Sequence, residues 1–446
     1  MANILLVTHW TSGDVMPFIK LGESLNKQGH DVTIFTHCIY RDKAIGKGLN
    51  FEALDTMTEY QEMVRDFPLL SDPIGNLEGA LNFQRKHHGH TRCLREVKLI
   101  QNHCRRKDTI LLFRHRSSVS ALLAAESMNK PATSVFLSPN YISHLAFHEE
   151  LFGKVMKEEI NRVRQTMGLE PIQCWTDWMC STKRKIALWP QWYANQEDEA
   201  LDGLVKAGFL VDEGQSQEVF SPELQAFLDR YSKPVIITGG TSRMINPRFY
   251  KVAVDGCMLL KQPAIVISPF EEFVPTYLPE YIRHFTYVPL RQLMPYACAI
   301  IHHGGINTAC EAVACAIPQL ILAHMADRPD NAQRLKQLGV AKSLPESLWT
   351  AEVLAHELST LDTAERRTMC LRLSEIHHGE NPVYRLNTIL EEMLDNPSFV
   401  PSCHDIKPFM SVTQRENDTA SPEALPSASL SKRKQLLMEI LRSKAK

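Results

Sequence analysis

Short apolar runs alternate with helix-like repeats through the first third of the chain. Residues 4–8 and 31–36 are apolar runs, and residues 18–28 between them carry apolar side chains at helical spacing up to Gly29. The same order of strand, helix and strand recurs at residues 109–113, 119–128 and 133–137. Strands that are buried on both faces read as continuous apolar runs, so this alternation predicts a parallel sheet with helices on both sides.

A second block with the same alternation begins at Pro234. Its expected strands and helices are, in chain order, residues 235–238, 249–260, 264–268, 299–302, 306–315 and 319–322. Two successive α/β blocks of similar size predict two Rossmann-like, doubly wound domains that face each other across a cleft. We place the first domain at residues 1–215 and the second at residues 216–380.

Other segments break this alternation. Residues 139–192 contain a charged helical stretch at 154–167 and several tryptophans, which fits either an acceptor-side insertion or a peripheral helical subdomain. We expect a last helix at residues 381–396, followed by a flexible linker and a short basic helix at 397–446. We interpret that basic helix as a protein-docking element, although a tail without contacts and a membrane-surface helix fit the same pattern.

The composition narrows the class of protein. The 446 residues include 49 Lys and Arg against 51 Asp and Glu, so the formal charge is −2, and no basic patch indicates a nucleic-acid partner. The apolar start of the chain lacks a basic segment, so we interpret it as a buried strand rather than a signal peptide, and no apolar run is long enough to span a membrane. The 11 cysteines include no Cys-x-x-Cys pair, which favours free thiols in a reducing cytoplasm.

The most informative chemical pattern begins at the end of the strand expected at residues 299–302. His303 follows this strand, Gly304 and Gly305 make a turn, and a helix begins at residue 306. Glycines let the backbone approach a ligand, and the unpaired amides at a helix start attract an anion such as a diphosphate. A tight strand-to-helix turn would use the same glycines, so this segment alone leaves both interpretations open.

Two more turns follow expected strands of the second domain. Residues 238–242 combine two glycines with hydroxyl side chains, and Asp327 and Arg328 come after the strand at 319–322. Because the carboxyl ends of parallel strands meet at one edge of a sheet, we expect these turns to lie beside His303. A carboxylate there can accept hydrogen bonds from sugar hydroxyls, so the three turns together predict a nucleotide-sugar pocket.

With these residues in place, the chain resembles the UDP-glycosyltransferase family of the two-domain GT-B fold. Within it, the most similar branch holds sterol, macrolide, glycopeptide and rhamnolipid glycosyltransferases, and the resemblance covers roughly residues 1–395. It implies an inverting hexosyltransferase of natural-product biosynthesis, and a last helix that crosses back to the first domain. The signature that carries it runs through Tyr287, Val288, His303, Asn307, Thr308, Glu311, Pro318, Asp327 and Asn331.

The family's donor contacts carry over to this chain position by position. Tyr287 resembles the aromatic residue that stacks on the base, and Val288 the residue that bonds the base through its backbone. Glu311 resembles the carboxylate that holds both ribose hydroxyls, which favours a UDP-sugar over a dTDP-sugar, and Asp327 resembles the acid that binds the sugar. The full set of expected donor-binding residues is Ser12, Gly13, Thr241, Ser242, Tyr287, Val288, His303, Gly305, Ile306, Asn307, Thr308, Glu311, Asp327 and Arg328.

Two positions depart from the family pattern. Arg328 stands where the family usually has Gln, which leaves the identity of the sugar open. Leu290 stands where many plant members have Gln, which removes one polar contact.

The first domain supplies the expected catalytic residue, Asp14, within a Ser-Gly-Asp-Val match to the bacterial and sterol branch. Asp14 stands where plant members carry a catalytic His, and a carboxylate just after the first strand can take the proton of an acceptor hydroxyl. The same residue can instead cap the helix that follows. Plant members support the base with an acid after a later strand, but residues 112–116 contain none here, so Asp14 works alone or His115 replaces it.

No metal or other cofactor is expected, because backbone amides and His303 can stabilise the leaving diphosphate. The histidines at 87–88, 90 and 377–378 lack metal-ligand spacing, so we expect them on the solvated surface. The expected partners are a nucleotide-sugar donor and a small lipophilic or natural-product acceptor. Two other functions fit the same fold: a nucleotide-sugar epimerase, and an auxiliary homologue that has lost turnover.

Overall fold

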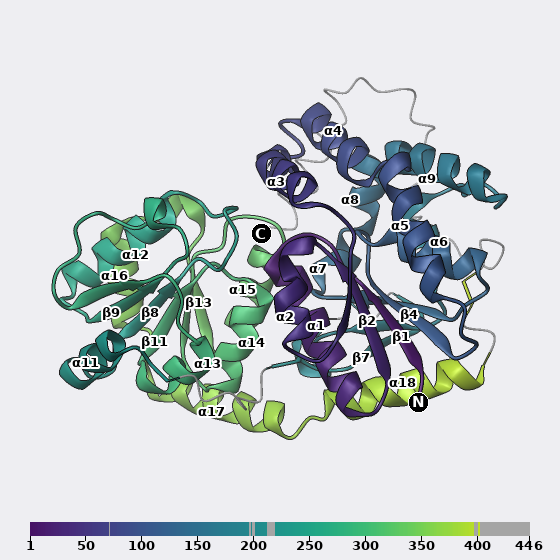
Figure 1. The fold of residues 1–446 in the computed structure, drawn as a ribbon. Helices are drawn as coiled ribbons and strands as arrows, with labels where there is room; N and C mark the ends of the chain where they lie inside the picture. Colours follow the sequence, from purple (N-terminus) through teal and green to yellow (C-terminus); the bar gives the residue numbers. More distant parts are fainter. Residues whose placement is uncertain (71, 196–197, 199–200, 212–218, 397–399, 402–446) are drawn as a thin grey trace, which may run out of the picture.

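The computed structural model describes residues 1–70, 72–195, 198, 201–211, 219–396 and 400–401, and two domains lie side by side in it (Figure 1). Each is built on one parallel sheet, as the alternation of apolar runs predicts. Among these residues the first sheet has 7 strands in the order β3-β2-β1-β4-β5-β6-β7. Its strands are β1 (Asn3–Val7), β2 (Asp31–Thr36), β3 (Asn50–Ala53), β4 (Thr109–Arg114), β5 (Ala132–Phe136), β6 (Lys185–Ala187) and β7 (Leu204–Lys206).

The second sheet has 6 strands within the described residues, in the order β10-β9-β8-β11-β12-β13. They are β8 (Val235–Thr238), β9 (Ala264–Ile267), β10 (Ile282–Phe285), β11 (Ala299–His302), β12 (Gln319–Ile321) and β13 (Ala341–Ser343). The mixed α/β class and the pair of doubly wound sheets that the sequence predicts are therefore confirmed.

Helices cover both faces of each sheet (Figure 1). Those of the first domain are α1 (Ser12–Lys27), α2 (Arg41–Ile45), α3 (Met57–Asp66), α4 (Leu77–His88), α5 (His90–His103), α6 (Val119–Ser127), α7 (Asn140–Ser143), α8 (Leu145–His148), α9 (Lys154–Met167) and α10 (Trp175–Met179). The later helices are α11 (Pro222–Arg230), α12 (Arg248–Leu259), α13 (Leu290–Leu293), α14 (Ile306–Ala314), α15 (Arg328–Gln337), α16 (Ala351–Ser359), α17 (Ala364–His378) and α18 (Pro382–Asp395). No helix of the described residues is long and apolar enough to cross a membrane.

The period of the strands divides each core into two layers. Every residue of β1 is buried, and successive side chains point to opposite faces. Ile4 and Leu6 pack with α1 and α18 on one face, whereas Leu5 and Val7 pack with α5, α6 and α9 on the other. Because both faces are covered, the strand needs apolar residues at every position, which is why its sequence shows no alternation.

Helix α18 packs against the first domain although it follows the second in sequence. Its Leu386, Ile389 and Leu390 lie in the same apolar cluster as β1 and α1, and Figure 1 shows it running beneath the first sheet while α17 runs beneath the second. The start of α18 lies beside the end of the first domain, because a side chain at Gly208 would lie 3.3 Å from Pro382. The chain thus returns to the first domain next to the segment that follows β7.

Some predicted bounds are wrong for a physical reason. Helix α1 begins at Ser12, six residues before the expected start at residue 18, because Thr11 and Asp14 form a capping box ahead of the apolar repeat. The sequence pattern also misses β3, β6, β7, β10 and β13, which have 3 or 4 residues each. These short strands at or near a sheet edge each contain a polar or charged residue, so they do not form the apolar runs by which the inner strands are recognised.

A buried arginine joins the domains. The Arg334 guanidinium donates to Asp198 Oδ2 (2.7 Å) and to the Tyr193 carbonyl (3.1 Å) in the first domain, and to Asp330 Oδ2 (2.8 Å) on its own helix. Asp198 is 0% exposed, so its charge depends on this partner.

Replacing Arg334 with Ala should therefore cost about 3–5 kcal/mol of stability, because it leaves two carboxylates without their cation. The matched control is Arg367→Ala, which breaks an exposed pair with Asp362 and should leave the denaturation midpoint nearly unchanged. Equal midpoints for the two variants would show that the interdomain ion pair does not hold the fold.

Candidate active site

The order of strands reverses at one place in each sheet. In the first sheet β2 and β3 lie on one side of β1 and β4 on the other, and in the second sheet β9 and β10 lie on one side of β8 and β11 on the other. Parallel α/β sheets bind ligands at such points, outside the carboxyl ends of the strands. Asp14 lies in the first turn of α1 after β1, and Arg114 is the last residue of β4. Thr241 and His303 lie in the loops after β8 and β11, so the two switch points define the candidate site.

His303 and the start of α14 form the core of the second-domain side. Gly305 is the N-cap of α14 without a side-chain cap, so the first amides of the helix remain available to an anion. The Nδ1 atom of His303 has no hydrogen-bond partner among the described residues. Burial lowers the pKa of His303 well below its usual range, so the ring is neutral near pH 7 and one nitrogen can donate to a phosphate oxygen.

Two glycines fix the position of the His303 ring and of the turn beside it. Gly240 has φ +80°, and a Cβ atom there would lie 2.8 Å from the His303 ring. Gly304 has φ +89°, and its Cβ would lie 3.0 Å from the Arg328 carbonyl oxygen. Only glycine fits both positions, because the backbone is left-handed and a side chain would displace its neighbour.

Asn331 ties the turn at Asp327 to the turn at Gly304. Its amide nitrogen donates to the Gly304 carbonyl (3.0 Å) and to Asp327 Oδ2 (2.8 Å). Burial raises the pKa of Asp327, Arg328 and the bond from Asn331 oppose that rise, and the charge of Asp14 adds to it. Asp14 of the first domain is therefore close enough to Asp327 to interact with it electrostatically.

Glu311, the expected ribose carboxylate, forms an ion pair with a lysine of the other domain. Its Oε1 accepts from Lys20 Nζ at 2.9 Å, and Arg291 lies 3.6 Å from its Oε2. Nearby, Asn307 donates to the Gly13 carbonyl at 3.0 Å. That carbonyl is free because the residue four positions later is Pro17, which has no N–H for the helix.

The remaining donor-side residues are placed as follows. Tyr287 is 68% exposed at the end of the loop after β10, and the Val288 side chain is buried. Thr241 is exposed, and Ser242 accepts a bond from the Met244 amide. Ser12 lies 3.1 Å from the Tyr40 hydroxyl and so belongs to the first-domain side, whereas Ile306 is buried and Thr308 is partly exposed in the first turn of α14.

Asp14 has a cationic partner that the sequence analysis missed. Its Oδ1 accepts from Arg114 Nε (2.9 Å) and Nη2 (2.7 Å), and its Oδ2 accepts from the Thr11 amide (3.1 Å) and hydroxyl (2.9 Å). Asp14 thus both caps α1 and lies at the switch point of the first sheet. The Leu-Phe-Arg-His-Arg run was the available signal, because it puts Arg114 at the end of the strand next to β1.

The alternative base His115 lies inside the core. It is 2% exposed and stacks on Phe136 with ring centroids 3.9 Å apart. Burial, with the charges of Arg116 and Arg114, lowers its pKa well below the usual range. A ring enclosed in this way does not reach an acceptor hydroxyl, so Asp14 remains the candidate base.

The expectation that the paired histidines are solvated is wrong for three of them. His87 is 2%, His88 8% and His377 6% exposed. His87 bonds Asp66 and His88 accepts from the Trp10 indole, because the end of α4 packs onto the site-facing side of the first domain. The described residues contain no group of three or more His, Cys, Asp or Glu that could hold a metal ion.

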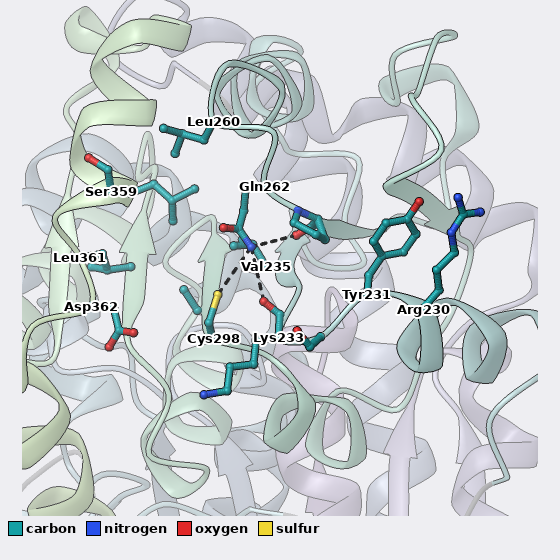
Figure 2. A pocket seen from close by; sticks show the side chains of 14 residues that line it. Arg230, Tyr231, Lys233, Val235, Leu260, Gln262, Cys298, Ser359, Leu361 and Asp362 are labelled. Carbon is teal, nitrogen blue, oxygen red and sulfur yellow. Dashed lines mark hydrogen bonds between the residues drawn. The ribbon is translucent and has the colours of Figure 1, made fainter.

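One groove of the described residues lies away from this chemistry. It is at the amino ends of β8 and β11 and has a volume of about 600 Å³, and Figure 2 shows the side chains that line it. Lys233, Gln262, Cys298 and Asp362 are among its lining residues. Since ligands of such sheets bind at the carboxyl ends, the groove is no part of the candidate site.

Three kinds of comparison agree with this geometry. The family described as "Erythromycin biosynthesis protein CIII-like, C-terminal domain" matches residues 265–381. O-mycaminosyltylonolide 6-deoxyallosyltransferase of Streptomyces fradiae is 24% identical over 427 residues, which cover 87% of this chain and 97% of that protein. Sterol 3-beta-glucosyltransferase of Saccharomyces cerevisiae is 23% identical over 407 residues, which cover 80% of this chain, and the chain spans only 32% of its length.

Solved structures share the architecture. The glycotransferase of kitacinnamycin superposes with a TM-score of 0.69 at 16% identity, covering 88% of this chain and 99% of that one. VinC, a glycosyltransferase solved in complex with dTDP, gives a TM-score of 0.65 at 15% identity, with the same coverage of 88% and 99%. These likenesses establish the GT-B fold.

The glycine at position 240 gives a direct test of the donor side. Gly240→Ala should displace the His303 ring and weaken UDP binding, because the new Cβ would lie 2.8 Å from it. Gly29→Ala is the matched control: it also has positive φ, +87°, but meets nothing within 4 Å. Both variants should lose about 1 kcal/mol of stability from backbone strain, and calorimetry should show weaker UDP binding only for Gly240→Ala. Equal UDP affinities of the two variants would show that the His303 ring does not contact the nucleotide.

Proposed function

We propose that this chain, which belongs to the GT-B glycosyltransferases of the UDP-glycosyltransferase family, transfers a sugar from a nucleoside diphosphate to a small acceptor hydroxyl with inversion. The observation that carries the proposal is the hydrogen bond from Asn307 to the Gly13 carbonyl (3.0 Å), which brings the first turn of α1, with Asp14, against the start of α14 beside His303. A proton acceptor lies on the first domain and an anion-binding turn lies on the second. Those are the two groups that a displacement at the anomeric carbon requires.

The second domain stabilises the leaving diphosphate. The amides at the start of α14 point outward with the positive end of the helix dipole, and the neutral His303 supplies one further N–H. Both act on the charge that develops as the anomeric carbon–oxygen bond breaks. Asp327 and Arg328 border the same turn, where sugar hydroxyls would lie.

The first domain activates the acceptor. Asp14 takes the proton from the acceptor hydroxyl as its oxygen attacks the anomeric carbon. Because Asp14 and the leaving diphosphate belong to opposite domains, attack and departure take place on opposite faces of the sugar, and the configuration inverts. Arg114 holds the carboxylate in place, and the Thr11 hydroxyl can rotate away to open a lone pair on Oδ2 for the acceptor proton.

The ribose side supports a UDP-sugar as donor. Glu311 lies one turn after the start of α14, where it can accept bonds from two adjacent hydroxyls. A site built around both hydroxyls discriminates against a deoxyribose that lacks one of them. Lys20 donates to Glu311 in this structure, so a nucleotide that binds here replaces Lys20 as a partner of the carboxylate.

The nucleotide preference is tested by calorimetry with UDP and dTDP. Wild type should bind UDP more tightly, and Glu311→Gln should reduce that difference, because an amide accepts on one atom only. Lys20→Ala serves as the control, since it removes the competing partner but keeps the carboxylate. Tighter binding of dTDP by the wild type would overturn the assignment of Glu311, and failure of both nucleotides to bind would overturn the proposed function itself.

The role of Asp14 is tested with Asp14→Asn. Turnover should fall by roughly 10²–10⁴-fold while UDP affinity stays the same, because the proton acceptor is lost and the donor side is untouched. Because the variant also removes the counterion of the buried Arg114, its thermal midpoint is measured beside its activity, with Arg114→Met as the comparison. Near wild-type turnover in Asp14→Asn would place the base elsewhere.

A further inference from the structure

The inward-facing arginines of this protein almost all have carboxylate partners. Among the described residues the pairs are Arg92 with Asp55 and Glu96, Arg114 with Asp14, Arg164 with Glu126, and Arg334 with Asp198 and Asp330. Arg116 and Arg328 differ, since the structure shows no ion pair for either within the described residues. Arg328 borders the donor turn already described, whereas Arg116 lies on the acceptor side.

Arg116 is held between aromatic rings at the end of β4. Its guanidinium carbon lies 5.6 Å from the centre of the Trp10 ring and 5.2 Å from that of Tyr141. Its Nη1 donates to the ring of His148, whose pKa burial lowers well below the usual range, so that ring is a neutral acceptor. Burial lowers the pKa of Arg116 to about 10, and the side chain therefore stays charged near pH 7.

The nearby carboxylate of Asp14 offsets the charge of Arg116 only in part, because it is bonded to other groups. Asp14 accepts two bonds on each oxygen, from Arg114 and Thr11, and forms no ion pair with Arg116 among the described residues. Arg114 also places a second positive charge nearby, which works against Arg116. Rings and a neutral imidazole lessen the cost of an enclosed charge, but they do not neutralise it.

Backbone strain at the same place is an independent observation. Arg116 has φ +72° and Trp10 has φ +88°, although neither is glycine. The two residues follow β4 and β1, the adjacent strands at the switch point, and their side chains meet. Left-handed non-glycine residues cost of order 1–3 kcal/mol each and gather where a ligand must be held. These two strained residues thus bring the cation and the ring together at the switch point.

We propose that Arg116 is an acceptor-binding residue and that the acceptor is a small carboxylic acid, whose carboxylate Arg116 binds while Trp10 and Tyr141 border its apolar part. A guanidinium offers a planar pair of N–H groups that matches a carboxylate. Since Arg116 is partly exposed, the anion reaches it without rearrangement of the core. This assignment rests on the proposed function and names the chemical class of its acceptor.

The test uses matched probes on the full chain. A set of hydroxylated aromatic and aliphatic carboxylic acids and their methyl esters is screened for binding, with calorimetry and ligand-observed NMR as readouts. At least one acid should bind about 10–100-fold more tightly than its ester, since a hydrogen bond to a charged group is lost in the ester. Equal binding of acids and esters, or binding by neither, overturns the proposal.

Variants then locate the effect. Arg116→Gln should abolish the preference for the acid while ester affinity and UDP affinity stay the same, and Arg116→Lys should keep part of it. Arg41→Gln is the matched control, because Arg41 also stacks on a ring, Phe51 at 5.0 Å, but lies on the exposed surface of the same domain. A change in UDP affinity instead of acid affinity would assign Arg116 to the donor and overturn the proposal.

A purely structural role gives a different result. If Arg116 served only to hold Trp10 and Tyr141, Arg116→Gln would lower the thermal midpoint, whereas an uncompensated cation predicts an equal or higher midpoint in the absence of ligand. Failure of the proposed function is distinguishable, because then no UDP-sugar or dTDP-sugar would bind or hydrolyse while the preference for acids remained.

Discussion

One buried amide holds the site together. The side chain of Asn331 is 0% exposed and uses all four of its hydrogen-bonding positions: it donates to the Gly304 carbonyl and Asp327, and it accepts from Ser138 and from the Tyr193 hydroxyl. A buried polar group is costly unless it is fully bonded. Asn331 is fully bonded only when the turn at Gly304, the start of α15 and two segments of the first domain are all in place. The turn at Gly304 and the domain interface therefore depend on each other.

The architecture was predictable because strands buried on both faces need apolar residues at every position. Runs such as Ile4-Leu5-Leu6-Val7 are recognisable in the sequence, and His303 with its glycines marks the end of such a strand. Strands β3, β6, β7, β10 and β13 were not predicted, since polar or charged residues interrupt their few positions.

The sequence did not show which distant residues pair with each other. Arg114 stands 100 positions after Asp14, and Glu311 stands 291 positions after Lys20, yet each pair shares hydrogen bonds. No local pattern encodes such a pairing, because it depends on which strands and domains become neighbours. The same limit explains why the burial of the paired histidines was not predicted. His88 belongs to the polar end of α4, but Trp10, from the loop after β1, covers it.

The attachment of α18 to the first domain limits where the domains can move relative to each other. A side chain at Gly208 would lie 3.3 Å from Pro382, and Arg385 donates to the carbonyls of Lys206 and Ala207. Because Leu386, Ile389 and Leu390 also pack into the core around β1 and α1, α18 moves as part of the first domain although it follows the second in sequence. A change in the angle between the domains therefore has to be taken up between the end of α17 and the start of α18, and not within either helix.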